Sequence, residues 1–201
     1  MSKLSNDNGY IIYTDGAEKI LVGYIGAETD LVLPDYITQI YQYAFYNSDS
    51  LTSVVIGESV TSIGACAFSS CDSLTSVVIP DSVTSIGAYA FYNCDSLTSV
   101  EIPDSVTSIG NSAFSNCANL TSVEIPDSVT SIGNSAFYNC DSLKSVYYKG
   151  TSSEWSSISI DSFNADLTNA TRYYYIENEA DVPTDGGNYW HYGENGEILV
   201  W

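Results

Sequence analysis

The chain is 201 residues long and carries a formal net charge of −20, because 25 aspartates and glutamates face only 5 lysines and arginines. This length suits one well-buried body rather than several independent domains. Binding to nucleic acids or anionic membranes depends on lysine and arginine, so the composition argues against both kinds of partner. No apolar run approaches the roughly 20 residues of a membrane span, and segment 1–7 lacks the apolar core of a secretory signal. We therefore expect no membrane insertion, and either a cytoplasmic protein or a trimmed part of an exported one.

The N-terminal segment is predicted to form a β-hairpin. Two apolar runs, 10–13 and 20–24, flank residues 14–17, whose Asp-Gly pair favours a tight turn. We expect residues 1–28 to form a cap that closes one end of the molecule.

The middle of the chain repeats itself every 23 residues, almost letter for letter. The copies that begin at Leu74, Leu97 and Leu120 contain Leu-x-x-Val-x-Ile-Pro, then Val-x-x-Ile-Gly, then Ala-Phe-x-x-Cys. A period in this range indicates one supersecondary unit stacked on copies of itself, so that each copy buries its apolar face against its neighbours. We therefore expect a single solenoid over residues 29–149. The repeat starts at Leu51, Leu74, Leu97, Leu120 and Leu143.

Within one copy, the apolar spacing predicts two extended pieces and a helical turn. Val100 and Ile102 alternate with Glu101, which predicts a short strand with Glu101 facing outward. Segment 106–110 predicts a second extended piece that ends at a glycine bend. Inward residues spaced by three over 111–117 predict a short helical turn. Stacking such copies aligns five phenylalanines in the core: Phe45, Phe68, Phe91, Phe114 and Phe137.

A cysteine and a carboxylate also recur with the repeat. Cysteines stacked in register point in parallel rather than at each other, so we expect buried free thiols, not disulfides or a zinc site. Cys66 lies off this register and is the one candidate for reactivity. The recurring carboxylate is expected to cap a turn, with cation binding as the alternative, and no metal site is assigned. The cysteines are Cys71, Cys94, Cys117 and Cys140, and the carboxylates are Asp35, Glu58, Asp81, Asp104 and Asp127.

The repeat pattern ends after Gly150, and residues 150–201 are expected to form a C-terminal cap. Segments 189–192 and 198–201 predict a closing hairpin. His191, the only histidine, lies in this hairpin, where a packing role is a better interpretation than general-base chemistry. No Gly-x-Ser-x-Gly elbow, P-loop or His-Glu-x-x-His motif is present. We therefore expect no enzyme activity, no catalytic residue and no cofactor.

The three recurring motifs, in fixed order and spacing, closely resemble the BspA-like leucine-rich repeat family over residues 29–149. The resemblance implies the fold class: an α/β solenoid, a right-handed superhelix of 23-residue repeats with short parallel strands and short helical turns, capped by β-hairpins. It also implies a cell-surface or secreted bacterial protein that binds host or neighbouring-cell surface proteins. Intracellular relatives leave a cytoplasmic setting open.

Variation among the copies indicates which surface binds a partner, because core positions are constrained while outward positions are free. The outward strand position changes from apolar to acidic to aromatic along the chain. Exposed apolar side chains on a sheet have no folding reason to be there, although drift between duplicated repeats is the alternative. The predicted partner-binding residues are Val55, Val78, Glu101, Glu124 and Tyr147, and a second candidate set on the opposite face comprises Tyr43, Tyr46, Tyr89, Tyr92 and Tyr138.

The sequence thus predicts a monomeric, non-catalytic protein-binding module of adhesin type that contacts its partner through the solenoid strands. The alternatives are a structural spacer, or a carbohydrate-binding module that uses aromatic faces. If the strands bind the partner, Glu101→Lys with Glu124→Lys is expected to change binding and to alter stability by less than about 1 kcal/mol. The candidate carbohydrate-binding aromatics are Tyr147, Tyr148, Trp155 and Trp190.

Overall fold

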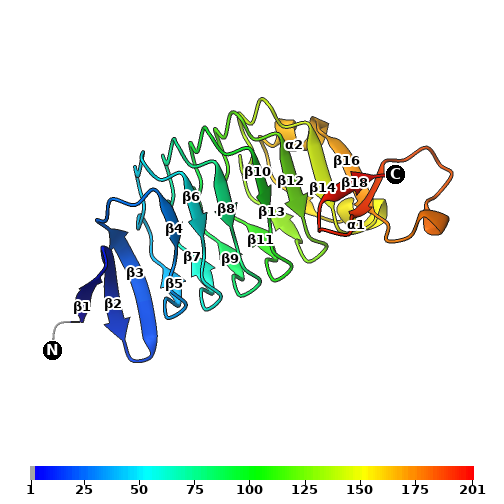
Figure 1. Cartoon of the computed structure of the whole chain (residues 1–201). Helices are drawn as coiled ribbons and strands as arrows, with labels where there is room; N and C mark the ends of the chain where they lie inside the picture. The colour runs from blue at the N-terminus through cyan, green and yellow to red at the C-terminus, as the bar shows by residue number, and fades with distance from the viewer. Residues whose placement is uncertain (1–2) are drawn as a thin grey trace.

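A computed structural model describes residues 3–201, so the first two residues of the expected 1–28 cap and of segment 1–7 lie outside the described residues. The chain winds into an elongated solenoid whose short strands line up along its length (Figure 1). Strands dominate this architecture, and the few helices lie in the C-terminal part.

One side of the solenoid consists of two sheets, which we call the strand face. Successive strands pair in parallel, and equivalent residues of neighbouring copies lie opposite each other, as for Val54 and Val77. This register places Val54 and Val77 inward and Val55 and Val78 outward, as the alternation predicted. The first sheet contains β4 (Asp30–Val32), β6 (Ser53–Val55) and β8 (Ser76–Val78). The second contains β10 (Ser99–Glu101), β12 (Ser122–Ile125), β14 (Ser145–Tyr148), β16 (Thr171–Tyr175), β17 (Tyr189–Tyr192) and β18 (Ile198–Val200).

A nine-stranded sheet forms a second side and begins with the N-terminal cap. The predicted hairpin is confirmed: β2 (Tyr10–Asp15) and β3 (Glu18–Tyr24) pair antiparallel around Gly16, whose φ is 62°. An additional strand, β1 (Leu4–Asp7), pairs antiparallel with β2. The remaining strands are the second extended pieces of the repeats: β5 (Gln39–Ile40), β7 (Ser62–Ile63), β9 (Ser85–Ile86), β11 (Ser108–Ile109), β13 (Ser131–Ile132) and β15 (Ser159–Ile160).

The predicted short helical turn is wrong, because segment 111–117 forms consecutive tight turns instead. Ser112 and Asn116 adopt left-handed φ angles of 53° and 60°, which interrupt a right-handed helix. The backbone N–H of Phe114 donates to the carbonyl of Ala136 in the next copy, at 2.8 Å, rather than within its own turn. Inter-copy bonding thus replaces helical bonding, and the fold is a mostly-strand β-solenoid. The right-handed sense of its winding stays a prediction.

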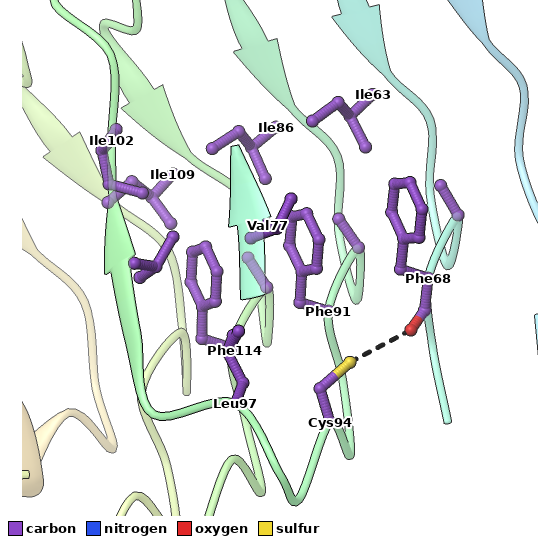
Figure 2. Packing of buried hydrophobic residues seen from close by; sticks show 14 of the residues in the cluster. Ile63, Phe68, Val77, Ile86, Phe91, Cys94, Leu97, Ile102, Ile109 and Phe114 are labelled. Carbon is purple, nitrogen blue, oxygen red and sulfur yellow. Dashed lines mark hydrogen bonds between the residues drawn. The ribbon is translucent and has the colours of Figure 1, made fainter. Parts of the chain in front are cut away.

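The core is a continuous stack of phenylalanine rings (Figure 2). The rings of Phe68 and Phe91 lie 5.2 Å apart and are nearly parallel, with an interplanar angle of 1°. Phe91 and Phe114 continue the stack at 5.3 Å. Each of the four in-register cysteines is a buried free thiol, as predicted, and the Cys94 thiol donates to the carbonyl of Phe68 at 3.1 Å.

Four of the second extended pieces end at a glycine bend where neighbouring copies approach closely, at Gly64, Gly87, Gly110 and Gly133. A Cβ on Gly110 would lie 2.7 Å from the carbonyl carbon of Gly87, well inside van der Waals contact. The backbones therefore meet here at a distance that only glycine allows.

Thiol reactivity is expected to separate Cys66 from the other cysteines. Burial raises the pKa of Cys71 and of Cys140 to about 12, and it also raises the pKa of Cys94 well above its ordinary value. The reactive thiolate is therefore scarce at these positions. A thiol titration of the native protein near pH 8 should modify only Cys66, and all 5 cysteines should react after denaturation. Rapid modification of a second thiol in the native protein would contradict this expectation.

Parallel pairing continues past Gly150. β15 pairs with β13, and β16 pairs with β14. Two short helices, α1 (Ser152–Trp155) and α2 (Ala165–Asn169), and a 3₁₀ turn, η1 (Glu179–Asp181), lie in this part of the chain. The predicted closing hairpin is confirmed, since β17 and β18 pair antiparallel. His191 stacks on Trp201 with ring centroids 3.8 Å apart, which gives it the packing role that the sequence indicated.

Candidate binding surface on the strand face

Three valines form an exposed apolar row on the strand face. Val32, Val55 and Val78 occupy equivalent positions on β4, β6 and β8, and they are 71%, 39% and 52% exposed. We call this row the valine strip. Because inward positions of the same strands already supply the core, the strip contributes little to folding and remains available to a partner.

The strip does not continue as an open surface to the C-terminal end, contrary to the sequence-based prediction. Glu101 is exposed, but Glu124 is only 6% exposed and Tyr147 is half-buried. The closing hairpin covers this end, since the Tyr192 hydroxyl on β17 donates to the Glu124 carboxylate. Glu124 therefore holds the cap in place and is not free for a partner. A shallow hollow of about 220 Å³ remains where the hairpin meets β10, lined in part by Glu101, Tyr147 and Ile198.

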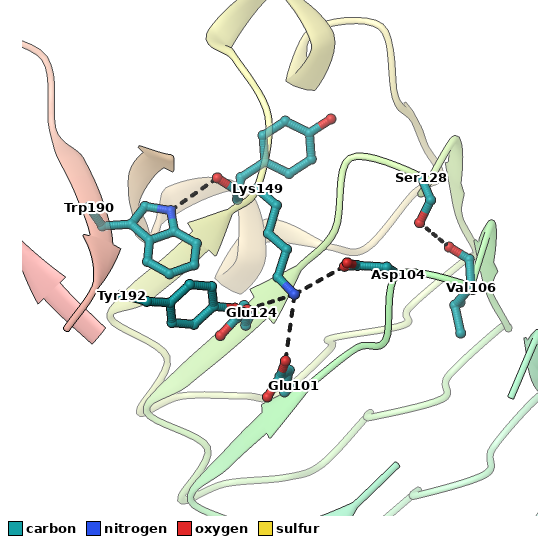
Figure 3. Close-up of polar contacts among 9 residues, drawn as sticks. Glu101, Asp104, Val106, Glu124, Ser128, Lys149, Trp190 and Tyr192 are labelled. Atoms are coloured by element: carbon teal, nitrogen blue, oxygen red, sulfur yellow. Dashed lines mark hydrogen bonds and ion pairs between the residues drawn. The ribbon is translucent and has the colours of Figure 1, made fainter. Parts of the chain in front are cut away.

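Lys149 lies at the centre of this covered end (Figure 3). Its ammonium lies 3.1 Å from a carboxylate oxygen of Glu124, 3.0 Å from one of Asp104 and 3.5 Å from one of Glu101. The ammonium also lies 5.7 Å from the centre of the Tyr192 ring, within cation–π range. We call these five residues the lysine cluster. One ammonium thus pairs with three carboxylates, and its contact with the Tyr192 ring ties the cap to the strand face.

Sequence reasoning did not identify Lys149, although a signal for it exists. Four earlier copies have proline at the position of Lys149, so a cation replaces a turn residue beside the acidic end of the strands; these are Pro34, Pro80, Pro103 and Pro126. The neighbouring hairpin is fixed by a second contact, in which the indole N–H of Trp190 donates to the carbonyl of Tyr148 at 3.0 Å.

Burial controls the ionisation of Glu124. Desolvation raises its pKa, and this effect outweighs the hydrogen bond from Tyr192 and the attraction of Lys149, which act in the opposite direction. Burial by itself would lower the pKa of Lys149, but hydrogen bonds with Asp104 and Tyr192 and the charge of Glu124 together raise it. Lys149 therefore stays charged while Glu124 is the titrating member of the pair.

The raised pKa of Glu124 predicts a pH dependence of stability. Between the ordinary value of 4.5 and the raised folded value, the folded chain binds a proton that the unfolded chain does not. The contribution of Glu124 to stability is therefore full below the unfolded pKa and is lost as the pH rises through the folded pKa. The Glu124→Gln variant keeps all the other carboxylates. The Tm of the wild type relative to that of this variant should therefore fall as the pH rises from about 4 to 7. A constant difference in Tm would contradict the raised pKa.

The aromatic faces expected for a carbohydrate site are buried. Tyr148, Trp155 and Trp190 are 1%, 7% and 0% exposed, and they pack against one another or against the cap. Among the four predicted residues, only Tyr147 retains part of its surface. Most tyrosines of the second candidate set are exposed, and Tyr43 and Tyr46 pack edge to face at 5.7 Å.

The five recurring carboxylates, Asp35, Glu58, Asp81, Asp104 and Asp127, are all exposed, and we call them the acidic ladder. The turn-capping role expected for them is wrong in the residues that the structure describes. The turns close through backbone bonds such as that from Val106 N–H to the Pro103 carbonyl, at 3.0 Å. The ladder carboxylates are therefore not used by the fold, except where Asp104 contacts Lys149.

Solved structures resemble this solenoid. A leucine-rich cell surface protein from Faecalibacterium prausnitzii A2-165 superimposes with a TM-score of 0.77 and 32% identity over 80% of this chain. This chain spans 43% of that protein. The T. pallidum leucine-rich repeat protein TpLRR has a TM-score of 0.68 and 32% identity, covering 71% of this chain and 70% of TpLRR. The pneumococcal vaccine antigen PcpA shares the fold, with a TM-score of 0.68 and 22% identity over 89% of this chain and 43% of PcpA.

The repeat itself matches a known sequence family. Among curated proteins, none matches the chain. The family model of the BspA type leucine-rich repeat region, by contrast, matches residues 29–169 in 6 copies. That match covers most of the chain and includes the copies whose phenylalanines and cysteines form the core. The chain belongs to the BspA-type leucine-rich repeat family.

Proposed function

We propose that this chain is a non-catalytic protein-binding module of adhesin type, displayed at the cell surface or secreted, which contacts a protein partner through its strand face. The observation that carries the proposal is the valine strip, an exposed apolar row on a sheet whose core is already complete. The F. prausnitzii relative is described as a cell surface protein, which supports the proposed location. None of the helices in residues 3–201 is long and apolar enough to span a bilayer.

The partner-binding residues proposed are Val55, Val78 and Glu101, which remain open. Glu124 and Tyr147 lie under or beside the cap and contribute to the surface only through the hollow at its edge. The proposed contact area therefore lies over β4, β6, β8 and β10, the half of the strand face that the closing hairpin leaves uncovered.

The proposal is tested by comparing two variants that differ only in which face they change. The immobilised chain is exposed to surface proteins released from neighbouring bacteria or host cells, and bound proteins are quantified. Val55→Ser with Val78→Ser should reduce binding about tenfold, because it removes apolar contact area. Tyr43→Ser with Tyr89→Ser is the matched control, since serine occupies the equivalent positions Ser112 and Ser135.

Each outcome separates the candidate functions. Loss of binding in the tyrosine variant alone would move the interface to the opposite face. No specific binding to any variant or to the wild type would favour a structural spacer. Binding to glycans without any bound protein would favour the carbohydrate alternative.

A further inference from the structure

The lysine cluster shows how a cationic side chain packs against the strand face. Glu101 occupies the same repeat position as Val78, and Asp104 occupies the same position as Asp81. The ammonium of Lys149 contacts both carboxylates at once, at 3.5 and 3.0 Å. The outward strand position and the acidic ladder are therefore close enough for one side chain to reach both.

The same geometry recurs along the valine strip without a cation of this chain. The strands stay in register, so Val78 lies beside Asp81, and Val55 beside Glu58, as Glu101 lies beside Asp104. By this equivalence, Lys149 is replaced by Pro103 in the copy that would cover Val55 and Glu58, and by Pro126 in the copy that would cover Val78 and Asp81. Within residues 3–201, the carboxylates of Glu58 and Asp81 form no ion pair.

We propose that the sheet formed by β4, β6 and β8 binds a polypeptide segment that carries both apolar and basic side chains. The apolar side chains pack on the valine strip, and lysine or arginine side chains pair with Glu58 and Asp81 as Lys149 does with Asp104. This inference rests on the proposed protein-binding function and names the chemistry of the partner. The outward side chains, not the backbone, provide recognition, because the backbone groups of these strands already pair with neighbouring copies.

Charge selects this partner over the other occupants of an apolar surface. A second copy of the chain brings a net charge of −20 and only 5 lysines and arginines, of which Lys149 is already engaged. Like-charge repulsion therefore opposes self-association, and it also opposes docking on an anionic membrane. A basic segment gains from the same field, which also accelerates its association.

The test uses short synthetic peptides of defined composition. A peptide of alternating lysine and valine is titrated against the full chain by calorimetry, beside a glutamate–valine peptide and a lysine–serine peptide. We expect the lysine–valine peptide to bind at least about tenfold more tightly than either control, and to weaken as salt is raised. Equal binding of the lysine–serine peptide would overturn the role of the valine strip. Absence of binding by the lysine–valine peptide would overturn the inference.

Matched charge variants locate the contact. Glu58→Gln with Asp81→Asn should weaken the lysine–valine peptide about tenfold, because two exposed ion pairs are lost. Asp49→Asn with Asp95→Asn removes the same charge from exposed positions that precede the strands, and should change affinity by less than about twofold. All four positions are exposed, so circular dichroism should confirm that both variants fold. If both double variants weaken peptide binding equally, the peptide is attracted by the overall charge of the protein rather than by Glu58 and Asp81, and the inference is overturned.

The failure of this inference is distinguishable from failure of the proposed function. A protein partner that is lost with Val55→Ser and Val78→Ser, yet unaffected by Glu58→Gln and Asp81→Asn, would support the proposed function and overturn the basic-segment inference. A partner that is unaffected by the valine variant would overturn both.

Discussion

Replacing Phe91 by alanine is expected to lower the free energy of unfolding by about 3–5 kcal/mol. Phe91 is fully buried, and its ring stacks between Phe68 and Phe114 at 5.2 and 5.3 Å. The substitution therefore removes contacts on both sides. The neighbouring copies cannot close the resulting cavity by sliding, because bonds such as that from Phe91 N–H to the Ala113 carbonyl, at 2.8 Å, hold them in register. Urea denaturation followed by circular dichroism measures the loss.

Phe163→Ala is the control for Phe91→Ala. The Phe163 side chain is 66% exposed, so its removal should change stability by no more than about 0.5 kcal/mol. The denaturant dependence is informative too, because a repeat protein is stabilised by interfaces between neighbouring copies. Weakening the interfaces of the central copy is expected to lower the m value or to split the unfolding transition into two steps. A loss at Phe91 below about 1 kcal/mol would contradict a continuous stacked core.

The repeat period alone predicted most of the fold, because each copy must present the same side chains to its neighbours. The phenylalanine stack, the free thiols and the outward position of Val55 all follow from that requirement. The helical turn did not follow, since inward residues spaced by three suit a helix and a chain of tight turns equally. The discriminating residue is Asn116, whose type tolerates the left-handed conformation that it adopts here. Recognition of that asparagine, which recurs as Asn93 and Asn139, would have favoured turns over a helix.

The candidate surface was only partly predictable. The open valine strip follows from alternation within one strand, which is local information. The burial of Glu124 depends on Tyr192, 68 residues away, and no local pattern connects the two. A final hairpin was predicted, but its docking onto the strand face requires knowing which side chains meet across that distance.

Replacing Lys149 by methionine is expected to lower the free energy of unfolding by about 3–5 kcal/mol, the usual cost of removing one partner from a buried ion pair. The Glu124 side chain is only 6% exposed and that of Lys149 only 18%, so water cannot replace the lost ammonium well. Glu101 and Asp104 would also lose the cation that they share with Glu124. Thermal unfolding and Trp190 fluorescence together measure the loss of stability and the release of the cap.

A second substitution separates the ion pair from packing. If the cost of Lys149→Met arises from the unpaired charge of Glu124, then adding Glu124→Gln should recover about 0.5–3 kcal/mol. Lys144→Met is the control, because Lys144 is exposed and its side chain forms no ion pair within residues 3–201; we expect a change within about 0.5 kcal/mol. Equal losses of stability for Lys149→Met and Lys144→Met would contradict the role of Lys149 in tying the cap to the strand face. The same reasoning revises the expectation for Glu101→Lys with Glu124→Lys. Each substitution places a further cation beside Lys149, so the double variant is expected to be destabilised, and partner binding is better tested with Val55→Ser and Val78→Ser.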